Sequence, residues 1–335
     1  MYTACEVANA QLGLAQLYDH PNRASLRRTA DALQAYGRAE SVYRDLLLRT
    51  DVLAQLDRQA APGDASSEGY LLHQIATIHG GRALLHLQQE DPEAAAREVE
   101  VALQLRRRNI DHEPQLVYVR AGLLTESTTG ARILLRLGQA QAALEASTLA
   151  WAELQEFARE EGPASKWAGA AMQALVTEPH GRALLANHRV QEALELLAVC
   201  QQHWQAQGTT DEAGAHGAAR VRLAAVQLAQ AEAMAQLQRP EESLQLATRV
   251  LEALQASGEA RAATGDDPTG RAARLLQAEA HALLSRLLSR LQPGAAQAHR
   301  QAAIQALLAA QAWQPPGRLG ADQERQLAAL QGGAA

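Results

Sequence analysis

The five-residue sequence GRALL, or a related one, recurs along the chain at a spacing of fifty residues. It stands, in full or in related form, at positions 81–85, 131–135, 181–185 and 231–235, with weaker copies at 30–33 and 281–284. A fixed period of roughly twenty to fifty residues is typical of repeat proteins, in which each repeat is one supersecondary unit that buries its apolar face on its neighbours. The sequence therefore predicts six copies of one small structural unit.

Each unit is predicted to be a pair of antiparallel helices. After every copy of the phrase comes a short segment with residues typical of turns, and then a second run in which small or apolar residues recur at intervals of three and four. The predicted turns are 36–38, 90–92, 137–139, 187–189, 238–240 and 292–294. Aromatic residues make up only 3% of the chain, and no segment carries the β-branched run of a strand, so the expected class is all-α.

The predicted organisation is a single helical-repeat domain over residues 1–335. An extra helix at 3–18 precedes the repeats, and a short helix at 320–331 caps them. The repeat units are expected at about 22–61, 68–109, 115–160, 164–207, 213–257 and 268–313. Polar loops rich in Gly, Asp, Ser and Pro separate the units and are expected to follow one edge of a solenoid.

The repeat resembles the tetratricopeptide repeat. The resemblance is carried by Ala131, Leu134, Gly138, Ala143 and Ala150, by Gly181, Leu184, Ala193 and Cys200, and by Ala231, Met234, Ser243 and Val250. It implies a right-handed α-solenoid that serves as a binding scaffold. The usual unit has about 34 residues, and the longer units of this chain are more similar to the sensor regions of bacterial LuxR-type activators and of peptide-sensing regulators.

Other classes of protein are disfavoured by composition and motifs. The net charge of -6 and the scarcity of aromatic residues argue against direct nucleic-acid binding. No signal peptide or membrane span is recognisable, so a cytoplasmic protein is expected. The common hydrolase, nucleotide-binding and zinc motifs are missing, and Cys5 and Cys200 imply no disulfide, so neither an enzyme nor a cofactor is predicted.

Two further clusters have plain structural interpretations. His73, His79 and His86 lie six and seven residues apart, without a carboxylate or Cys at ligand spacing, so no metal site is predicted. Arg106, Arg107 and Arg108 stand near the end of a predicted second helix, where positive charge complements the helix dipole.

One set of charged residues recurs with the repeat and is the candidate binding site. The residue after the small position of the first helix is Arg82, Arg132 and Arg182 in three successive units, then Glu232, with His86 and Arg136 one turn beyond the first two arginines. In the resembled fold the first helices line the concave groove, so these side chains would form an arginine ladder. Guanidinium groups bind carboxylates and phosphates through paired hydrogen bonds, and the ladder suits an acidic peptide or an anionic effector.

The alternative is that these arginines are structural. Glu178 stands four residues before Arg182 and could pair with it, and neighbouring units could supply carboxylates to Arg82 and Arg132. The predicted function is a non-catalytic scaffold or sensor for a protein or peptide, within a transcriptional regulator or signalling assembly. An open solenoid end rich in Ala and Leu also allows a homo-oligomer. The alternative function is an enzyme, or a phosphatase-like signalling accessory, that uses polar residues of the same groove.

Overall fold

The computed structural model describes residues 2–19, 26, 28–58, 66–89, 91–112, 117–162, 168–207, 215–259, 268–289, 291–311, 319 and 321–332. Every regular element in these ranges is an α-helix, which confirms the predicted all-α class. The chain forms two compact units, Met1–Leu134 and Leu135–Ala335. The single domain expected over 1–335 stays a prediction, and most of the predicted loops lie outside the described residues. None of the helices in these ranges is both long and apolar enough to cross a membrane.

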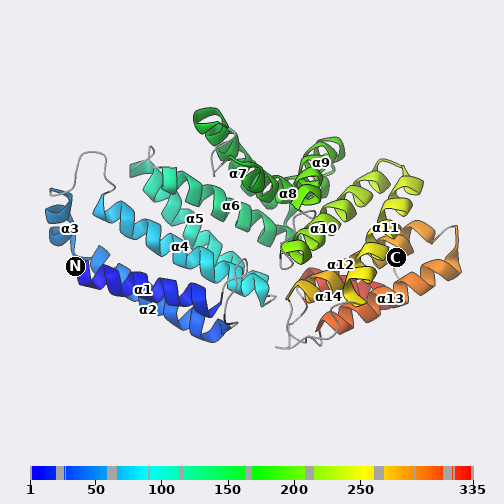
Figure 1. Cartoon of the computed structure of the whole chain (residues 1–335), viewed down its shortest axis with the longest axis horizontal. Coiled ribbons are helices and arrows are strands. Elements are labelled where there is room, and N and C mark those ends of the chain that lie inside the picture. The colour runs from blue at the N-terminus through cyan, green and yellow to red at the C-terminus, as the bar shows by residue number, and fades with distance from the viewer. Residues whose placement is uncertain are drawn as a thin grey trace. The chain divides into compact units, whose positions relative to one another are not determined.

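The first unit is built from successive helices that pack on one another (Figure 1). Its helices are α1 (Tyr2–Tyr18), α2 (Thr29–Leu47), α3 (Thr50–Asp57), α4 (Ser67–Gln88), α5 (Pro92–His112) and the part of α6 (Val117–Arg136) up to Leu134. Helix α1 packs on α2, α2 on α4, and α4 on α5. The hydroxyl of Ser66 accepts a hydrogen bond from the backbone N–H of Gly69 at 2.9 Å, and this cap fixes the start of α4.

The turn predicted at residues 36–38 is wrong. Helix α2 continues through these residues and pairs with α1, so the first hairpin is α1 with α2. Tyr36, Ala39 and Tyr43 form one buried face of α2 that packs in the core of the unit. A glycine inside a helix is unfavourable by only about 1 kcal/mol, so burial of that face keeps Gly37 helical.

The second unit repeats the helical hairpin with a regular spacing. It contains α7 (Ala140–Glu161), α8 (Ala170–Ala186), α9 (Val190–Gln207), α10 (Ala215–Gln236), α11 (Pro240–Glu259), α12 (Pro268–Leu288), α13 (Pro293–Gln311) and α14 (Ala321–Gly332). The hairpin partners are α8 with α9, α10 with α11, and α12 with α13. The first helices of these hairpins also contact one another, α8 with α10 and α10 with α12, so they share one wall of the unit.

Close helix packing explains the small residue at the start of the repeated phrase. A Cβ atom on Gly181 would lie 3.0 Å from Cγ of Leu197 on the facing helix α9. A Cβ atom on Gly81 would lie only 2.4 Å from the hydroxyl oxygen of Tyr36 on α2. The absence of a side chain therefore lets α8 approach α9 and lets α4 approach α2.

The hairpin turns show the same period in their backbone. Gly138, His188 and Gln238 have φ angles of 73°, 61° and 60°, in the left-handed region. In the last two turns the next residue closes the helix, because the N–H groups of Arg189 and Arg239 each donate to a carbonyl five residues back at 2.9 Å. Only glycine adopts this conformation without a steric penalty.

Replacing His188 or Gln238 by Gly is expected to stabilise the second unit by about 1 kcal/mol each, because the left-handed backbone penalty disappears. Urea unfolding of each variant would measure the change, with His188→Ala as the control that keeps the penalty. A Gly variant no more stable than the Ala variant would contradict this account.

Candidate functional site

A cavity opens on the wall formed by the first helices of the second unit. Its volume is about 560 Å³, and its lining comes from α8, α10, α12 and α14, with Leu135 at one side. The predicted residues Arg182 and Glu232 both line it, on α8 and α10 respectively. In each case the residue comes directly after the small residue that begins the repeated phrase. The structure thus brings these two members of the predicted set together in the second unit.

The lining residues follow the fifty-residue period in two rows. The first row holds Arg182, Glu232 and Ala282, one on each of the three first helices. The second row lies one helical turn further along each helix and holds Ala186, Gln236 and Arg286. Arg286 was missed from the sequence, although His86 and Arg136 occupy the same position of their own units.

The charged groups of the cavity are already paired. The Arg286 guanidinium lies 2.6 Å from a carboxylate oxygen of Glu232. Arg182 donates a hydrogen bond from Nη2 to the carbonyl of Ala225 at 3.0 Å, and its Nε lies 3.6 Å from Glu178, which confirms the predicted pair within α8. With Glu279 also in the lining, two cations and two carboxylates face the cavity, so the wall is polar and mixed in charge.

Two lining residues carry buried polar atoms whose hydrogen-bonding capacity is unused. Among the described residues, Nε of Arg182 and Oε1 of Gln236 are buried and have no hydrogen-bond partner. The first is a donor and the second an acceptor. Buried polar groups are nearly always hydrogen-bonded, and each exception is unfavourable by about 1–3 kcal/mol. Both atoms belong to residues that line the cavity.

In the first unit, Arg82 belongs to a compact charged cluster formed with Glu40, His79 and Glu98. Its Nη1 lies 2.6 Å from Glu40 of α2 and 3.9 Å from Glu98 of α5. The two ring nitrogens of His79 lie 3.2 Å from Glu40 and 2.5 Å from Glu98. Carboxylates from both flanking helices thus hold Arg82, so a ligand would have to displace them.

The charges of the cluster shift the pKa values of its members in a consistent way. The hydrogen bond from His79, helped by Arg44 and Arg82 and opposed by burial, holds the pKa of Glu40 well below its usual range. Burial lowers the pKa of His79, but the bonds and charges of Glu40 and Glu98 outweigh it and raise the value. His79 therefore favours the doubly protonated form, with both N–H groups donating to carboxylates.

The remaining members of the predicted set lie on α4 and α6. His86 follows Arg82 by one turn on α4. Burial raises the pKa of Glu98, but the hydrogen bond and charge of His79 outweigh it, with smaller contributions from Arg82 and His86, and lower the value. Arg132 and Arg136 are half-buried on α6, and both interact with other groups. Arg132 belongs to the first unit and Arg136 to the second. A continuous ladder of all six residues stays a prediction.

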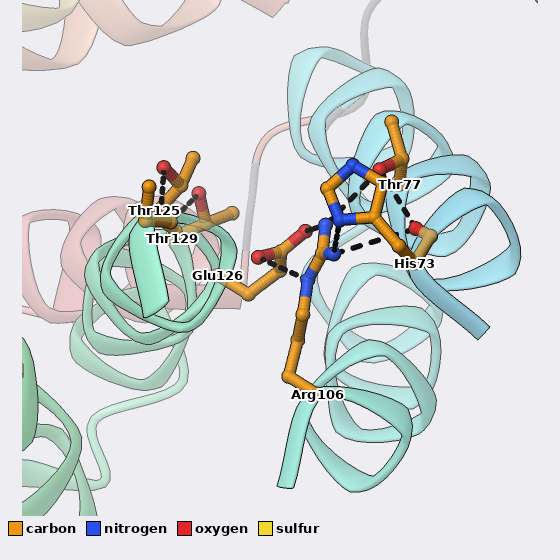
Figure 2. A network of polar contacts seen from close by, with 7 residues as sticks. His73, Thr77, Arg106, Thr125, Glu126 and Thr129 are labelled. Carbon is orange, nitrogen blue, oxygen red and sulfur yellow. Dashed lines mark hydrogen bonds and ion pairs between the residues drawn. The ribbon is translucent and has the colours of Figure 1, made fainter. Parts of the chain in front are cut away.

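A second network in the first unit is a buried ion pair that the sequence did not predict. Figure 2 shows Arg106 of α5 reaching across to Glu126 of α6, with contacts of 3.2 and 3.0 Å to its two carboxylate oxygens. The same guanidinium donates to Thr77 at 3.0 Å and lies 2.5 Å from Nδ1 of His73. Arg106 is 2% exposed and serves this ion pair, a role that the sequence did not predict, whereas Arg107 and Arg108 are exposed.

Two histidines of the first unit belong to these networks. His73 contacts Arg106, and His79 contacts Glu40 and Glu98. In the described part of the chain, no group of three or more His, Cys, Asp or Glu side chains is arranged to hold a metal ion. Cys5 and Cys200 are free thiols, and Cys200 is buried at the α8–α9 contact.

Comparisons with known proteins add a likeness of fold. No known protein-family profile and no curated protein sequence matches the chain. Among solved structures, the chain is similar to a putative kinesin light chain of Podospora anserina with nearly identical TPR-like repeats, at 21% sequence identity and a TM-score of 0.37. The match covers 69% of this chain and 98% of that one. Neither comparison supplies a ligand for the cavity, and the likeness to LuxR-type sensor regions stays a prediction.

Proposed function

We propose that the protein is a non-catalytic scaffold that binds a segment of another protein in the cavity of its second unit. The observation that carries this proposal is the cavity itself, a concave space lined by the first helices of three successive hairpins. Its lining combines apolar side chains such as Leu185 and Leu228 with a few charged groups, which is the usual make-up of a specific binding site.

The charged groups suggest how such a segment would be oriented. Arg182 and Arg286 are the cations of the cavity, and a carboxylate on the bound segment could pair with either one. The unused donor on Arg182 and the unused acceptor on Gln236 favour a ligand with polar groups of its own. An acidic peptide or an anionic effector, in a regulator or signalling assembly, remains the form of partner that we propose.

The alternative function, an enzyme, receives no specific support from the described residues. His79 of the first unit is one acid-base candidate, but both of its ring nitrogens face carboxylates. Its side chain is only 8% exposed. Such contacts favour the doubly protonated form of a histidine, which has no nitrogen available to accept a proton from a substrate.

Binding of peptides selected from a displayed random library tests the proposal. Replacing Arg182 and Arg286 together by Ala is expected to weaken the binding of selected acidic peptides by about tenfold or more, since each tenfold step corresponds to about 1.4 kcal/mol. Fluorescence anisotropy at low and high salt would measure the dissociation constants.

A matched control removes two arginines elsewhere on the same unit. Arg189 and Arg239 are exposed at the hairpin turns and pair only locally with Glu192 and Glu242. Replacing both by Ala removes the same charge and should leave the dissociation constants unchanged. A library that yields no binding peptide, or peptides that bind both double variants equally, would contradict the proposal.

A further inference from the structure

Helix α14 lies over the cavity that we propose as the binding site. Gln326, Ala329 and Leu330 of this helix form part of the cavity lining, facing residues of α8, α10 and α12. Leu330 is buried in a cluster with Ala282 of α12 and Leu307 of α13. The chain therefore places one of its own helices over the site.

Apolar side chains and a backbone hydrogen bond are among the contacts that hold α14 in place. Its apolar anchors are Leu327 and Leu330, together with Leu319 just before the helix. Arg300 of α13 adds a hydrogen bond of 2.5 Å to the carbonyl of Leu330. The helix has twelve residues, and helices shorter than about 12–15 residues are marginal on their own in water, so these contacts decide whether it forms.

The face that α14 turns to the cavity fills it poorly. Gln326 and Ala329 stand where a helix that fitted the space would carry large apolar side chains, and about 560 Å³ remains open. Across the cavity, Oε1 of Gln236 is buried without a partner within the described residues. Open space and an unpaired polar atom both weaken the contact.

We propose that α14 is a displaceable cover, and that the partner takes its place as an amphipathic helix. The geometry favours a helix because the site already accommodates one, with Gln323, Gln326, Leu327 and Leu330 at the three- and four-residue spacing of a single face. The partner helix would carry large apolar residues in place of Gln326 and Ala329, and a carboxylate directed to Arg182 or Arg286. This inference rests on the proposed function and adds the class of partner and its regulation.

The test uses full-length chains that differ only in α14. In the closed variant, Gln326→Leu with Ala329→Leu fills the cavity from within. In the open variant, Leu327→Asp with Leu330→Asp removes the anchors. The probe is a fluorescently labelled peptide with the sequence of residues 319–332 and leucine in place of Gln326 and Ala329.

We expect the probe to bind the open variant about tenfold tighter than the wild type, and the closed variant about tenfold weaker, because a tethered helix competes at a high effective concentration. Hydrogen exchange of the α14 amides should be faster in the open variant and slower in the closed one. Replacing the exposed Leu48 and Leu291 by Asp is the matched control, and it should change neither quantity.

The outcomes separate this inference from the proposed function. If the probe binds all three chains equally, α14 is not a displaceable cover. If the probe fails to bind the open variant, the partner does not bind as an amphipathic helix. If library peptides still depend on Arg182 and Arg286 in either case, the proposed function stands without the cover. If those peptides show no such dependence, both proposals fail.

Discussion

Replacing Glu126 by Ala is expected to destabilise the first unit by about 3–5 kcal/mol, the usual effect of removing one partner from a buried ion pair. The side chains of Arg106 and Glu126 are 3% and 6% exposed, and two hydrogen bonds join them. Without the carboxylate, a guanidinium would remain buried among α4, α5 and α6 with its charge uncompensated. Burial raises the pKa of Glu126, which shows how poorly this environment tolerates an unpaired charge.

Removing both charges should recover most of the lost stability. The double variant Arg106→Met with Glu126→Leu replaces the pair by apolar side chains of similar volume, a change that is often neutral or stabilising. Backbone surrounds the pair closely, because a Cβ on Gly122 would lie 2.4 Å from the Arg106 guanidinium and one on Gly80 would lie 2.9 Å from Glu126. Some strain on repacking is therefore expected, and the double variant should lie within about 1–2 kcal/mol of the wild type.

The measurement is urea unfolding, with hydrogen exchange of the α4 and α5 amides to assign the change to the first unit. The control is Glu68→Ala, which breaks an exposed ion pair between Glu68 of α4 and Arg108 of α5. The side chains of these two residues are 40% and 54% exposed. That exposed pair should contribute less than about 1 kcal/mol. A loss at Glu126 no larger than the loss at Glu68 would contradict the assignment of a buried pair.

The hairpin architecture could be predicted because its causes are local and repeated. The left-handed residues at 138, 188 and 238 keep the fifty-residue period of the sequence, and they lie in turns that the sequence predicted. The prediction of a turn at 36–38 was wrong for a physical reason. A glycine in an amphipathic run fits a helix interior or a turn, and the choice depends on packing against α1 and α4, which no local pattern contains.

The site was predictable only as far as the repeat register determines it. The register placed Arg182 and Glu232 on one wall, and it would also have given Arg286, had the second row been continued from His86 and Arg136. The pair of Arg182 with Glu178 could be predicted because the two residues are four positions apart, but the other pairs could not, because their partners are distant in sequence. Glu232 meets Arg286 over 54 positions, and Arg106 meets Glu126 through the packing of α5 against α6. Such pairs depend on how helices are rotated in the folded unit.

Acidification is expected to destabilise the first unit through His73, by about 1.4 kcal/mol for each pH unit between about 6.5 and 3. Burial, together with the charge of Arg106, lowers the pKa of His73 to about 3. Its Nδ1 lies 2.5 Å from the Arg106 guanidinium, and it must be unprotonated to accept that hydrogen bond. Below pH 6.5 the unfolded chain binds a proton at this residue while the folded unit does not, so stability falls as the pH falls.

The variant His73→Gln isolates this effect. Its side-chain oxygen can accept from Arg106, and it does not titrate, so the stability of the variant relative to the wild type should improve steadily as the pH is lowered from 6.5. The raised pKa of Glu126 acts in the opposite direction, since protonation of that carboxyl favours the folded state, and both proteins contain Glu126, which is coupled to residue 73 through Arg106. The control is His188→Gln, at an exposed turn position whose equivalent in the next hairpin is Gln238. The measurement is the free energy of unfolding of wild type and His73→Gln at several pH values, and the difference between the two should change in favour of the variant as the pH falls. A difference that is the same at every pH would show that His73 titrates alike in the folded and the unfolded state.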